Sequence, residues 1–248
     1  MGRLDGRIAV VSGAASGMGQ GAALQVAQEG AVIEILDRND ASETLALIRE
    51  AGGAAAASIC DVTDEDQIRV AAQAVEARRG RIDILVNNAG ILSGRKPWHE
   101  LTRAEVDRFL QVNFMGYFLV SQAFYPLLKK SSAERIINVA SRTYYLANPG
   151  QMAYVASKGA VMGFTRVLSK ELGPENITVN AVAPGMIATE GTLANSPVEA
   201  FDRVMQNQAI QKRGQPRHLA GLIAFLASDE AELITGQFML CDGGGYLL

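Results

Sequence analysis

Tyr154 and Lys158 lie four residues apart in the segment Tyr154-Val155-Ala156-Ser157-Lys158. In a helix, this spacing puts both side chains on one face. A free phenol, with a pKa near ~10, is almost wholly protonated at neutral pH, whereas a neighbouring ammonium group stabilises the phenolate and lowers that pKa. The pair therefore predicts a tyrosine that gives up or takes up a proton near pH 7. Ordinary surface pairs have the same spacing, so the rest of the chain must decide between the two interpretations.

Short β-rich runs alternate with helical patterns along the chain. Residues 8–12 and 32–37 are predicted strands, and an Ala-rich helical segment between them completes a βαβ unit. Further strands are predicted at 55–60, 82–87, 135–140, 177–182 and 237–241, with helices at 65–79, 104–130 and 151–172. Continuously apolar strands separated by helices imply a parallel sheet covered on both faces. The sequence thus predicts an α/β fold in a single domain, 1–248, with a Rossmann-like, doubly wound, seven-stranded parallel sheet.

Residues 185–215 interrupt this alternation. They are rich in small and polar side chains and contain Pro197. We expect this stretch to lie outside the sheet, with residues 186–215 forming a flap that covers the substrate.

A glycine-rich turn separates the first predicted strand from the first predicted helix. Glycines allow a tight turn and a close approach of the backbone to a pyrophosphate, and the following helix offers unpaired N–H groups and a favourable dipole. The Gly-x-x-x-Gly-x-Gly spacing differs from the commoner Gly-x-Gly-x-x-Gly, but its strand-turn-helix position favours a nucleotide site. The predicted contacts are Ser12, Gly13, Ser16, Gly17, Met18 and Gly19.

Asp37 ends the second predicted strand, where a carboxylate can accept hydrogen bonds from an adenosine ribose with free hydroxyls. A 2′-phosphate in that place would be repelled. Arg38 could offset part of the repulsion, but residues 12–19 contain no Arg or Lys to assist it. The sequence therefore favours NAD(H) over NADP(H). The alternative roles for Asp37 are helix capping and a solvated strand end.

Composition excludes several other classes of protein. The 248 residues are 48% hydrophobic, which is enough for a large core. The net charge is only -3, and acidic and basic residues are mixed along the chain, which argues against nucleic acid and anionic lipid as partners. We find no secretory segment and no apolar run long enough for a membrane span, and we expect a cytoplasmic location. Cys60, Cys241 and the isolated His99 and His218 lack the spacing of a metal centre, so we predict no metal.

Together these motifs resemble the classical short-chain dehydrogenase/reductase family over essentially the whole chain. The glycine turn is similar to the family's Thr-Gly-x-x-x-Gly-x-Gly, with Ser12 in place of Thr. Asn113, Ser141, Tyr154 and Lys158 fall where the family's catalytic tetrad is expected. Other similar motifs are Asp61-Val62 beside the adenine, Asn87-Asn88-Ala89-Gly90 bordering the cofactor, and Pro184-Gly185 with Ile187 and Thr189 at the nicotinamide carboxamide.

The resemblance implies a role for each residue of the tetrad. Ser141, at the end of a predicted strand, would hold the substrate oxygen, and Tyr154 would give that oxygen a proton in ketone reduction or remove one in alcohol oxidation. Lys158 would favour the phenolate and bind the nicotinamide ribose. Asn113 would leave a backbone carbonyl free for a water in a proton relay.

The sequence says less about the substrate and the assembly. Arg142 could pair with an anionic substrate or within the protein. Candidate residues for the pocket wall are Thr143, Tyr144, Tyr145, Leu92, Ser93 and Met152. The aromatic and apolar members of this set favour an aromatic or hydrophobic substrate. The helix 151–172 carries the small residues Ala153, Ala156, Gly159, Ala160 and Gly163. Such a surface suits self-association, with core packing within one subunit as the alternative. The resemblance implies a homotetramer that uses this helix and the long one before it.

The leading hypothesis is an oxidoreductase that transfers a hydride between NAD(H) and a small secondary alcohol or ketone. An NADPH-dependent 3-oxoacyl-carrier-protein reductase is the alternative within the same class, and basic residues such as Arg103, Arg108, Lys129 and Lys130 could receive its acidic carrier. A non-catalytic dinucleotide sensor or scaffold is the alternative from another class. It predicts loss of the proton-transfer residues, but Ser141, Tyr154 and Lys158 are all present.

Overall fold

Seven parallel strands form one sheet in the computed structural model, which describes residues 2–92 and 95–247. Their order is β3-β2-β1-β4-β5-β6-β7. The strands are β1 (Ile8–Ser12), β2 (Val32–Asp37), β3 (Ala55–Ile59), β4 (Ile84–Asn87), β5 (Arg135–Val139), β6 (Thr178–Pro184) and β7 (Phe238–Cys241). The predicted seven-stranded, doubly wound parallel sheet is therefore confirmed.

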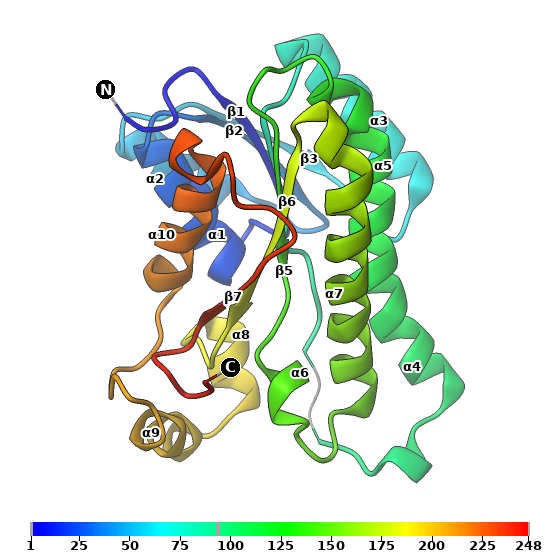
Figure 1. The fold of residues 1–248 in the computed structure, drawn as a ribbon, viewed down its shortest axis with the longest axis vertical. Helices are drawn as coiled ribbons and strands as arrows, with labels where there is room; N and C mark the ends of the chain where they lie inside the picture. The colour runs from blue at the N-terminus through cyan, green and yellow to red at the C-terminus, as the bar shows by residue number, and fades with distance from the viewer. Residues whose placement is uncertain (1, 93–94, 248) are drawn as a thin grey trace.

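Helices cover both faces of the sheet (Figure 1). One face carries α1 (Gly17–Gln28), α2 (Ser42–Glu50) and α10 (Pro216–Ala227). The other carries α3 (Glu65–Arg79), α4 (Arg103–Leu110), the π-helical turn η2 (Gln111–Met115), α5 (Gly116–Leu128) and α7 (Met152–Leu172). Shorter segments are α6 (Thr143–Leu146), α8 (Glu190–Asn195), α9 (Val198–Gln206) and the 3₁₀ turns η1 (Trp98–Glu100), η3 (Gly173–Glu175) and η4 (Asp229–Ala231).

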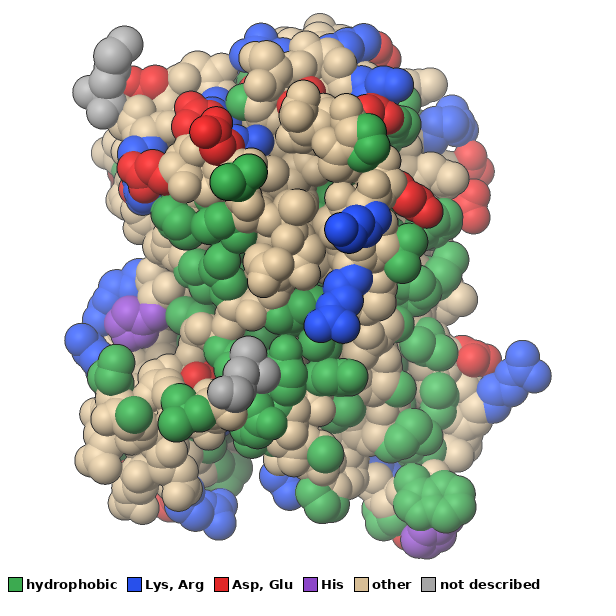
Figure 2. Space-filling view, viewed as in Figure 1, with side chains coloured by type: hydrophobic (Ala, Val, Ile, Leu, Met, Phe, Trp, Pro, Cys, Tyr) green, Lys and Arg blue, Asp and Glu red, His purple; other side chains and the backbone are tan. Residues whose placement is uncertain are grey.

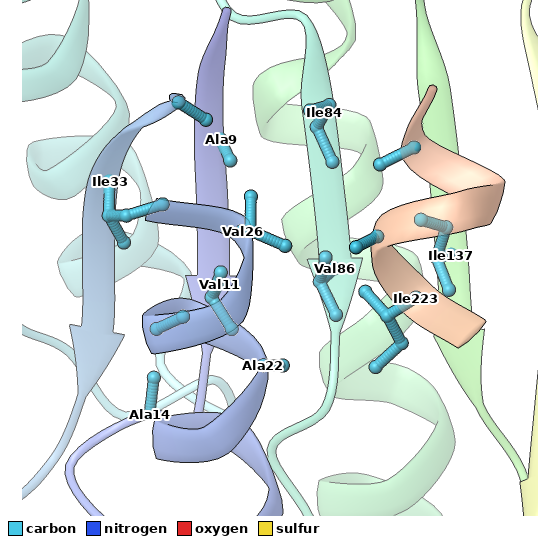
Figure 3. Close-up of a cluster of buried hydrophobic side chains, with 14 of the residues drawn as sticks. Ala9, Val11, Ala14, Ala22, Val26, Ile33, Ile84, Val86, Ile137 and Ile223 are labelled. Carbon is cyan, nitrogen blue, oxygen red and sulfur yellow. The ribbon is translucent and has the colours of Figure 1, made fainter. Parts of the chain in front are cut away.

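The core lies between the sheet and these helices. β1, β4 and β5 are buried along their whole length, and most of their side chains are apolar. Figure 3 shows Val11 and Val86 from the strands meeting Val26 of α1 and Ile223 of α10. A second cluster on the opposite face packs α3 and α5 against the same strands. Polar groups can then concentrate at the carboxyl edge of the sheet, at the lower end of the molecule in Figure 1.

Local signals set several helix boundaries. Asp64 accepts a hydrogen bond from the Gln67 N–H at 3.0 Å and caps the start of α3, and Gly80, with φ of 76°, ends that helix in the left-handed conformation. Thr102 and Glu105 form a reciprocal capping box at the start of α4.

The single helix predicted at 104–130 is interrupted in the structure. Between α4 and α5 the turn η2 widens, and the Gly116 N–H donates to the Gln111 carbonyl, five residues back. No periodicity in the side chains marks this change, because the apolar residues on both sides continue the same face. The sequence patterns also gave no bounds for α2 and α10.

Residues 186–215 lie outside the seven strands, as expected. They contain α8 and α9, and a short parallel bridge between Ile187 and Gly214 joins the two ends of the segment. Phe201 anchors α9, being only 2% exposed.

We expect Phe124→Ala to lower the free energy of unfolding by about 3–5 kcal/mol, because this α5 side chain is fully buried between helix and sheet and its removal leaves a cavity. Phe118→Ala, a matched change on the same helix at a side chain that is 37% exposed, should cost less than about 2 kcal/mol. Urea unfolding of both variants measures the difference. Equal losses would contradict this assignment of the core.

Candidate active site

Ser12 connects the end of β1 to the segment that follows β4. Its Oγ accepts hydrogen bonds from the backbone N–H groups of Asn88 at 3.0 Å and Ala89 at 3.1 Å. The Asn88 side chain donates in return to the carbonyls of Ser12 and Gly13, at 3.0 and 2.9 Å. The hydroxyl kept at position 12 and the Asn-Ala-Gly segment therefore act together to fix the glycine turn.

The glycine turn has no room for side chains at two of its positions. A Cβ on Gly13 would lie 2.6 Å from the Cα of Ala89, and one on Gly19 would collide with the Gly13 carbonyl. Gly13 and Gly17 also have φ of 67° and 64°, which glycine adopts without strain. Ser16 precedes α1 and makes no side-chain cap, so the first N–H groups of the helix are left for a ligand. This arrangement fits the pyrophosphate of a dinucleotide.

Asp37 lies against the glycine turn. Its carboxylate accepts hydrogen bonds from the Ala15 N–H and the Asn39 N–H, both at 2.9 Å, and the residue is buried, whereas Arg38 is exposed. A carboxylate has about four acceptor positions, so two backbone bonds leave capacity for the hydroxyls of a ribose. Asp61 caps its own turn by accepting from Thr63. Val62 is buried against Gly116.

Ser141 and Tyr154 meet just beyond the carboxyl end of β5. Both are buried, and Ser141 Oγ accepts hydrogen bonds from the Thr143 N–H at 3.2 Å and the Thr143 hydroxyl at 2.9 Å. Burial raises the pKa of Tyr154, and a hydrogen bond with Ser141 acts in the opposite direction. The phenol is therefore a proton donor at neutral pH.

Lys158, one helical turn after Tyr154 on α7, is buried, and its amine faces uncharged groups. The Nζ donates to the Val139 carbonyl at 2.7 Å and to the Tyr117 hydroxyl at 3.2 Å, and burial lowers the pKa of the amine to about 7. A Cβ on Gly90 would lie 3.6 Å from this Nζ, so the Asn-Ala-Gly segment borders the amine.

One expectation about this pair is corrected by the structure. The helical spacing predicts that Lys158 lowers the pKa of Tyr154, but the pKa of the phenol is raised. The reason is that the removal of water from the buried phenol outweighs the stabilisation of its phenolate by neighbouring groups.

Asn113 lies in η2 and is fully buried. Its side chain accepts from the Ile91 N–H at 2.8 Å and donates to the Ile91 carbonyl and the Ser157 hydroxyl, both at 3.1 Å. Ser157 in turn donates to the Tyr154 carbonyl at 2.7 Å. Asn113 thus ties the segment after Gly90 to α7. Its proposed water relay remains a prediction.

The segment after β6 closes the site from the other side. Gly185 donates its N–H to the Cys241 carbonyl at 3.0 Å, and Ile187 is buried. Thr189 caps α8 by accepting from the Thr192 N–H at 3.2 Å, and its side chain would lie 3.6 Å from a Cβ on Gly17. The structure therefore brings the Pro184-to-Thr189 segment to the glycine turn.

Arg142 is paired within the protein. It is buried, and its Nη1 lies 3.2 Å from Asp242 Oδ2. Of the two roles expected for Arg142, pairing within the protein is therefore confirmed. Gln208, from the segment after α9, donates to the Asp242 carbonyl at 2.8 Å. Asp242 therefore joins the residue after Ser141 to the C-terminal turn and to the proposed flap.

The tyrosines expected in the pocket wall pack mainly with one another. Tyr145 stacks on Tyr246 with ring centroids 5.2 Å apart, and Tyr144 meets Tyr145 edge-on and lies against Gly159 of α7. The aromatic ring that meets the phenol is instead Phe109 of α4, edge-on to Tyr154 with ring centroids 6.4 Å apart. Leu92 and Met152 are exposed, and Ser93 lies outside the described residues.

Sequence reasoning missed three residues of the site: Tyr117, Phe109 and Ser157. Their positions give a partial signal, since Tyr117 follows Asn113 by one helical turn and Ser157 follows Tyr154 by three residues. Which neighbour each one meets depends on the widened turn η2 and on the packing of α4 and α5 against α7.

Two findings concern other kinds of site. Within residues 2–92 and 95–247 no group of three or more His, Cys, Asp or Glu side chains could hold a metal ion. In the same described part of the chain, no helix has the length and apolar character needed to cross a membrane.

Comparison with known proteins identifies the class. Residues 13–245 match the family model described as enoyl-(acyl carrier protein) reductase. The chain is 39% identical to a 3-oxoacyl-(acyl-carrier-protein) reductase of Thermotoga maritima, with 98% of each chain covered, and 36% identical to a cyclopentanol dehydrogenase of Comamonas sp., again with 98% of each covered. The chain also resembles a solved structure of 7α-hydroxysteroid dehydrogenase complexed with NADH and 7-oxo glycochenodeoxycholic acid. The TM-score is 0.93 and the identity 33%, with 98% of this chain and 95% of that one covered.

The fold, the glycine turn and these relatives define an oxidoreductase that binds a nicotinamide dinucleotide. The chain belongs to the classical short-chain dehydrogenase/reductase family.

The buried amine of Lys158 makes stability depend on pH. Its pKa falls from 10.5 to about 7 on folding, so between those values the unfolded chain binds more protons and stability rises with pH. Below pH 7 the folded protein carries the full cost of a buried ammonium ion. We expect Lys158→Met to raise the free energy of unfolding at pH 6 by roughly 2–4 kcal/mol, and the gain to shrink towards pH 10.

Urea unfolding of the cofactor-free protein at pH 6, 8 and 10 measures this gain. Lys170→Met, at an exposed position on the same helix, is the matched control and should change stability little at any of these values. A stability loss in Lys158→Met that is largest at pH 6 would contradict the burial cost.

Proposed function

We propose that this protein transfers a hydride between NAD(H) and a secondary alcohol or ketone, with Tyr154 as the general acid and base. The observation that carries this proposal is that Ser141 and Tyr154 meet beyond β5, while the amine of Lys158, one helical turn after Tyr154, lies at the end of β5 and borders Gly90. Three groups suited to proton transfer share one buried place with a dinucleotide cradle.

In this proposal Ser141 and Tyr154 have different roles in proton transfer. The Ser141 hydroxyl holds the substrate oxygen, and the Tyr154 phenol donates its proton to that oxygen during ketone reduction. Its raised pKa keeps it protonated and ready to donate at pH 7. In alcohol oxidation the same oxygen gives its proton to Tyr154. The nicotinamide, when bound, supplies or accepts the hydride.

The chain offers contacts for each part of the cofactor. The glycine turn and the start of α1 would hold the pyrophosphate, Asp37 the adenosine ribose, and Asp61 and Val62 the adenine. Asn88, Ala89, Gly90 and Lys158 would border the nicotinamide ribose. The segment of Pro184, Gly185, Ile187 and Thr189 would hold the carboxamide, and its position against Gly17 supports this assignment.

Two apolar side chains on the proposed substrate side support a preference. Phe109 meets Tyr154 edge-on, and Leu92 is exposed in the segment after Gly90. These groups support a small hydrophobic or aromatic ketone. Residues 186–215 would cover it as a flap that moves about the Ile187–Gly214 bridge.

A 3-oxoacyl-carrier-protein reductase remains the second candidate, favoured by the family model and by the Thermotoga relative. The surface charges support it less. Lys130 lies 2.7 Å from Glu76, Lys129 lies 3.7 Å from Glu175, and Arg103 lies 3.2 Å from Asp107. These three basic groups are thus partly neutralised by their neighbours and attract an acidic carrier weakly, whereas Arg108 is exposed.

The assembly proposed is a homotetramer that uses α7. Ala156, Gly163 and Val167 are exposed on this helix, whereas Ala153 is buried within the subunit. Figure 2 shows hydrophobic side chains along the face that α7 presents to the viewer, interrupted by basic ones. A cytoplasmic location is part of the same proposal.

We expect Tyr154→Phe to lower kcat by about 10²–10⁴-fold, because it removes the proton donor, while NADH affinity stays within about twofold. Absorbance of NADH with a panel of ketones and secondary alcohols measures turnover, and fluorescence titration measures binding. Tyr145→Phe is the matched control, since this ring stacks on Tyr246 and should keep its activity. Full activity in Tyr154→Phe would rule out the acid and base role, and absence of turnover by the parent protein would favour a sensor or scaffold.

We expect the parent protein to prefer NADH to NADPH in initial rates, and Asp37→Asn to reduce that preference by about tenfold, or about 1.4 kcal/mol. The amide oxygen can still accept from Ala15, so the glycine turn keeps its support while the negative charge is lost. Asp40→Asn, a nearby exposed carboxylate, is the control. A strong preference of the parent protein for NADPH would overturn the cofactor assignment and favour the carrier-protein reductase.

A further inference from the structure

Tyr117 places a second phenol beside the amine of Lys158. It projects from α5 and is 1% exposed. Its hydroxyl accepts a hydrogen bond from the Lys158 Nζ at 3.2 Å and donates to the Val139 carbonyl at 3.1 Å, and the Nζ lies 5.1 Å from the centroid of its ring. The ring and the hydroxyl thus both stabilise a positive charge on the amine.

The two bonds also fix where the amine points. An ammonium group has three N–H donors, and the Val139 carbonyl and the Tyr117 hydroxyl occupy two of them. Both acceptors lie on the side of β5 and α5. The remaining donor is left for a further acceptor, and Gly90 borders the same amine.

The titratable group in direct contact with this amine is the Tyr117 phenol of α5, while β5 contributes the Val139 carbonyl and the segment after β4 contributes Gly90. Tyr154 lies one helical turn before Lys158 on α7 and acts electrostatically on Tyr117. Burial raises the pKa of Tyr117 well above its ordinary value, and the nearby Tyr154 adds to the effect. Tyr117 therefore stays a neutral phenol, able to accept from Lys158 and to donate to Val139 at the same time.

We propose that Tyr117 is a positioning residue that holds the Lys158 ammonium at the end of β5, in the orientation in which it serves Tyr154 and the cofactor ribose. The inference rests on the proposed function, in which Lys158 has those two roles. It gives α5 a part in proton transfer through Lys158, because the hydroxyl on one helix sets the charge and direction of an amine on another.

Loss of the Tyr117 hydroxyl should lower the pKa of Lys158. Without this acceptor the charged form of Lys158 is less stable, so the amine is protonated less often near neutral pH. A less charged Lys158 stabilises the Tyr154 phenolate less. The acidic limb of the pH profile for alcohol oxidation, which reports deprotonation of the catalytic base, should then move to higher pH.

The test is Tyr117→Phe, which removes the hydroxyl and keeps the buried ring. We expect the midpoint of the acidic limb of kcat/KM for alcohol oxidation to rise by about one unit, which is about tenfold in rate below the midpoint, with recovery at higher pH. Fluorescence titration should show the Kd for NADH rising about three- to tenfold, because the amine is no longer held in place. A crystal structure of the cofactor-free variant should show the Nζ displaced from its present position.

Tyr125→Phe is the matched control. It makes the same change on the same helix, at a hydroxyl that donates to Glu175 on the exposed side of α5, and should leave all three measurements as in the parent. A pH midpoint and an NADH Kd in Tyr117→Phe equal to those of Tyr125→Phe would overturn the inference. A loss of rate that is the same at every pH would also overturn it, since a packing role alone gives that result.

Failure of the proposed function gives a different pattern. If the parent protein oxidises no alcohol, or if Tyr154→Phe stays active, the function is wrong. The NADH titration and the position of the Nζ in Tyr117→Phe still decide the inference in that case. A weaker Kd with a displaced amine supports it, and unchanged values overturn it.

Discussion

The amine of Lys158 can be buried only because uncharged acceptors meet its N–H groups. An ammonium ion taken out of water loses far more solvation energy than a single hydrogen bond returns, which is why its pKa falls to about 7. The Val139 carbonyl is available because β5 has ended and its last carbonyl needs a partner outside the strand. The end of a strand and the side chain of a helix thus satisfy each other, and the proposed site is built around that contact.

The neighbouring elements are held to this contact by polar side chains inside the protein. Asn113 connects the segment after β4 to α7 through Ile91 and Ser157, and Ser12 connects the glycine turn to the same segment through Asn88. The bonds to the backbone N–H groups of Ile91 and Asn88 satisfy donors that would otherwise need water as a partner. The nucleotide end and the chemical end of the site therefore share one rigid segment, residues 88–91, between them.

The outer wall of the site is organised by Asp242. Its carboxylate meets Arg142, directly after Ser141, and its carbonyl accepts from Gln208, beyond α9. A buried ion pair costs desolvation and gives little net stability, but it permits few alternative arrangements. It fixes the residue after Ser141 relative to the segment that we propose as a flap. The charge of Arg142 is thereby paired within the protein and buried.

The sequence by itself determined the sheet, the glycine turn and the order of the proposed site residues. These features are local, because strand runs, turn glycines and the spacing of Tyr154 and Lys158 depend on neighbours in the chain. The tertiary structure decided the widened turn at Asn113, the pairing of Arg142 with Asp242, the stacking of Tyr145 on Tyr246, and the partners of the Lys158 amine. Each of these depends on which distant residues meet after the helices pack on the sheet. The pKa of Tyr154 shows the difference most directly, because spacing predicts the effect of one neighbouring charge, while burial by the whole fold sets the direction of the shift.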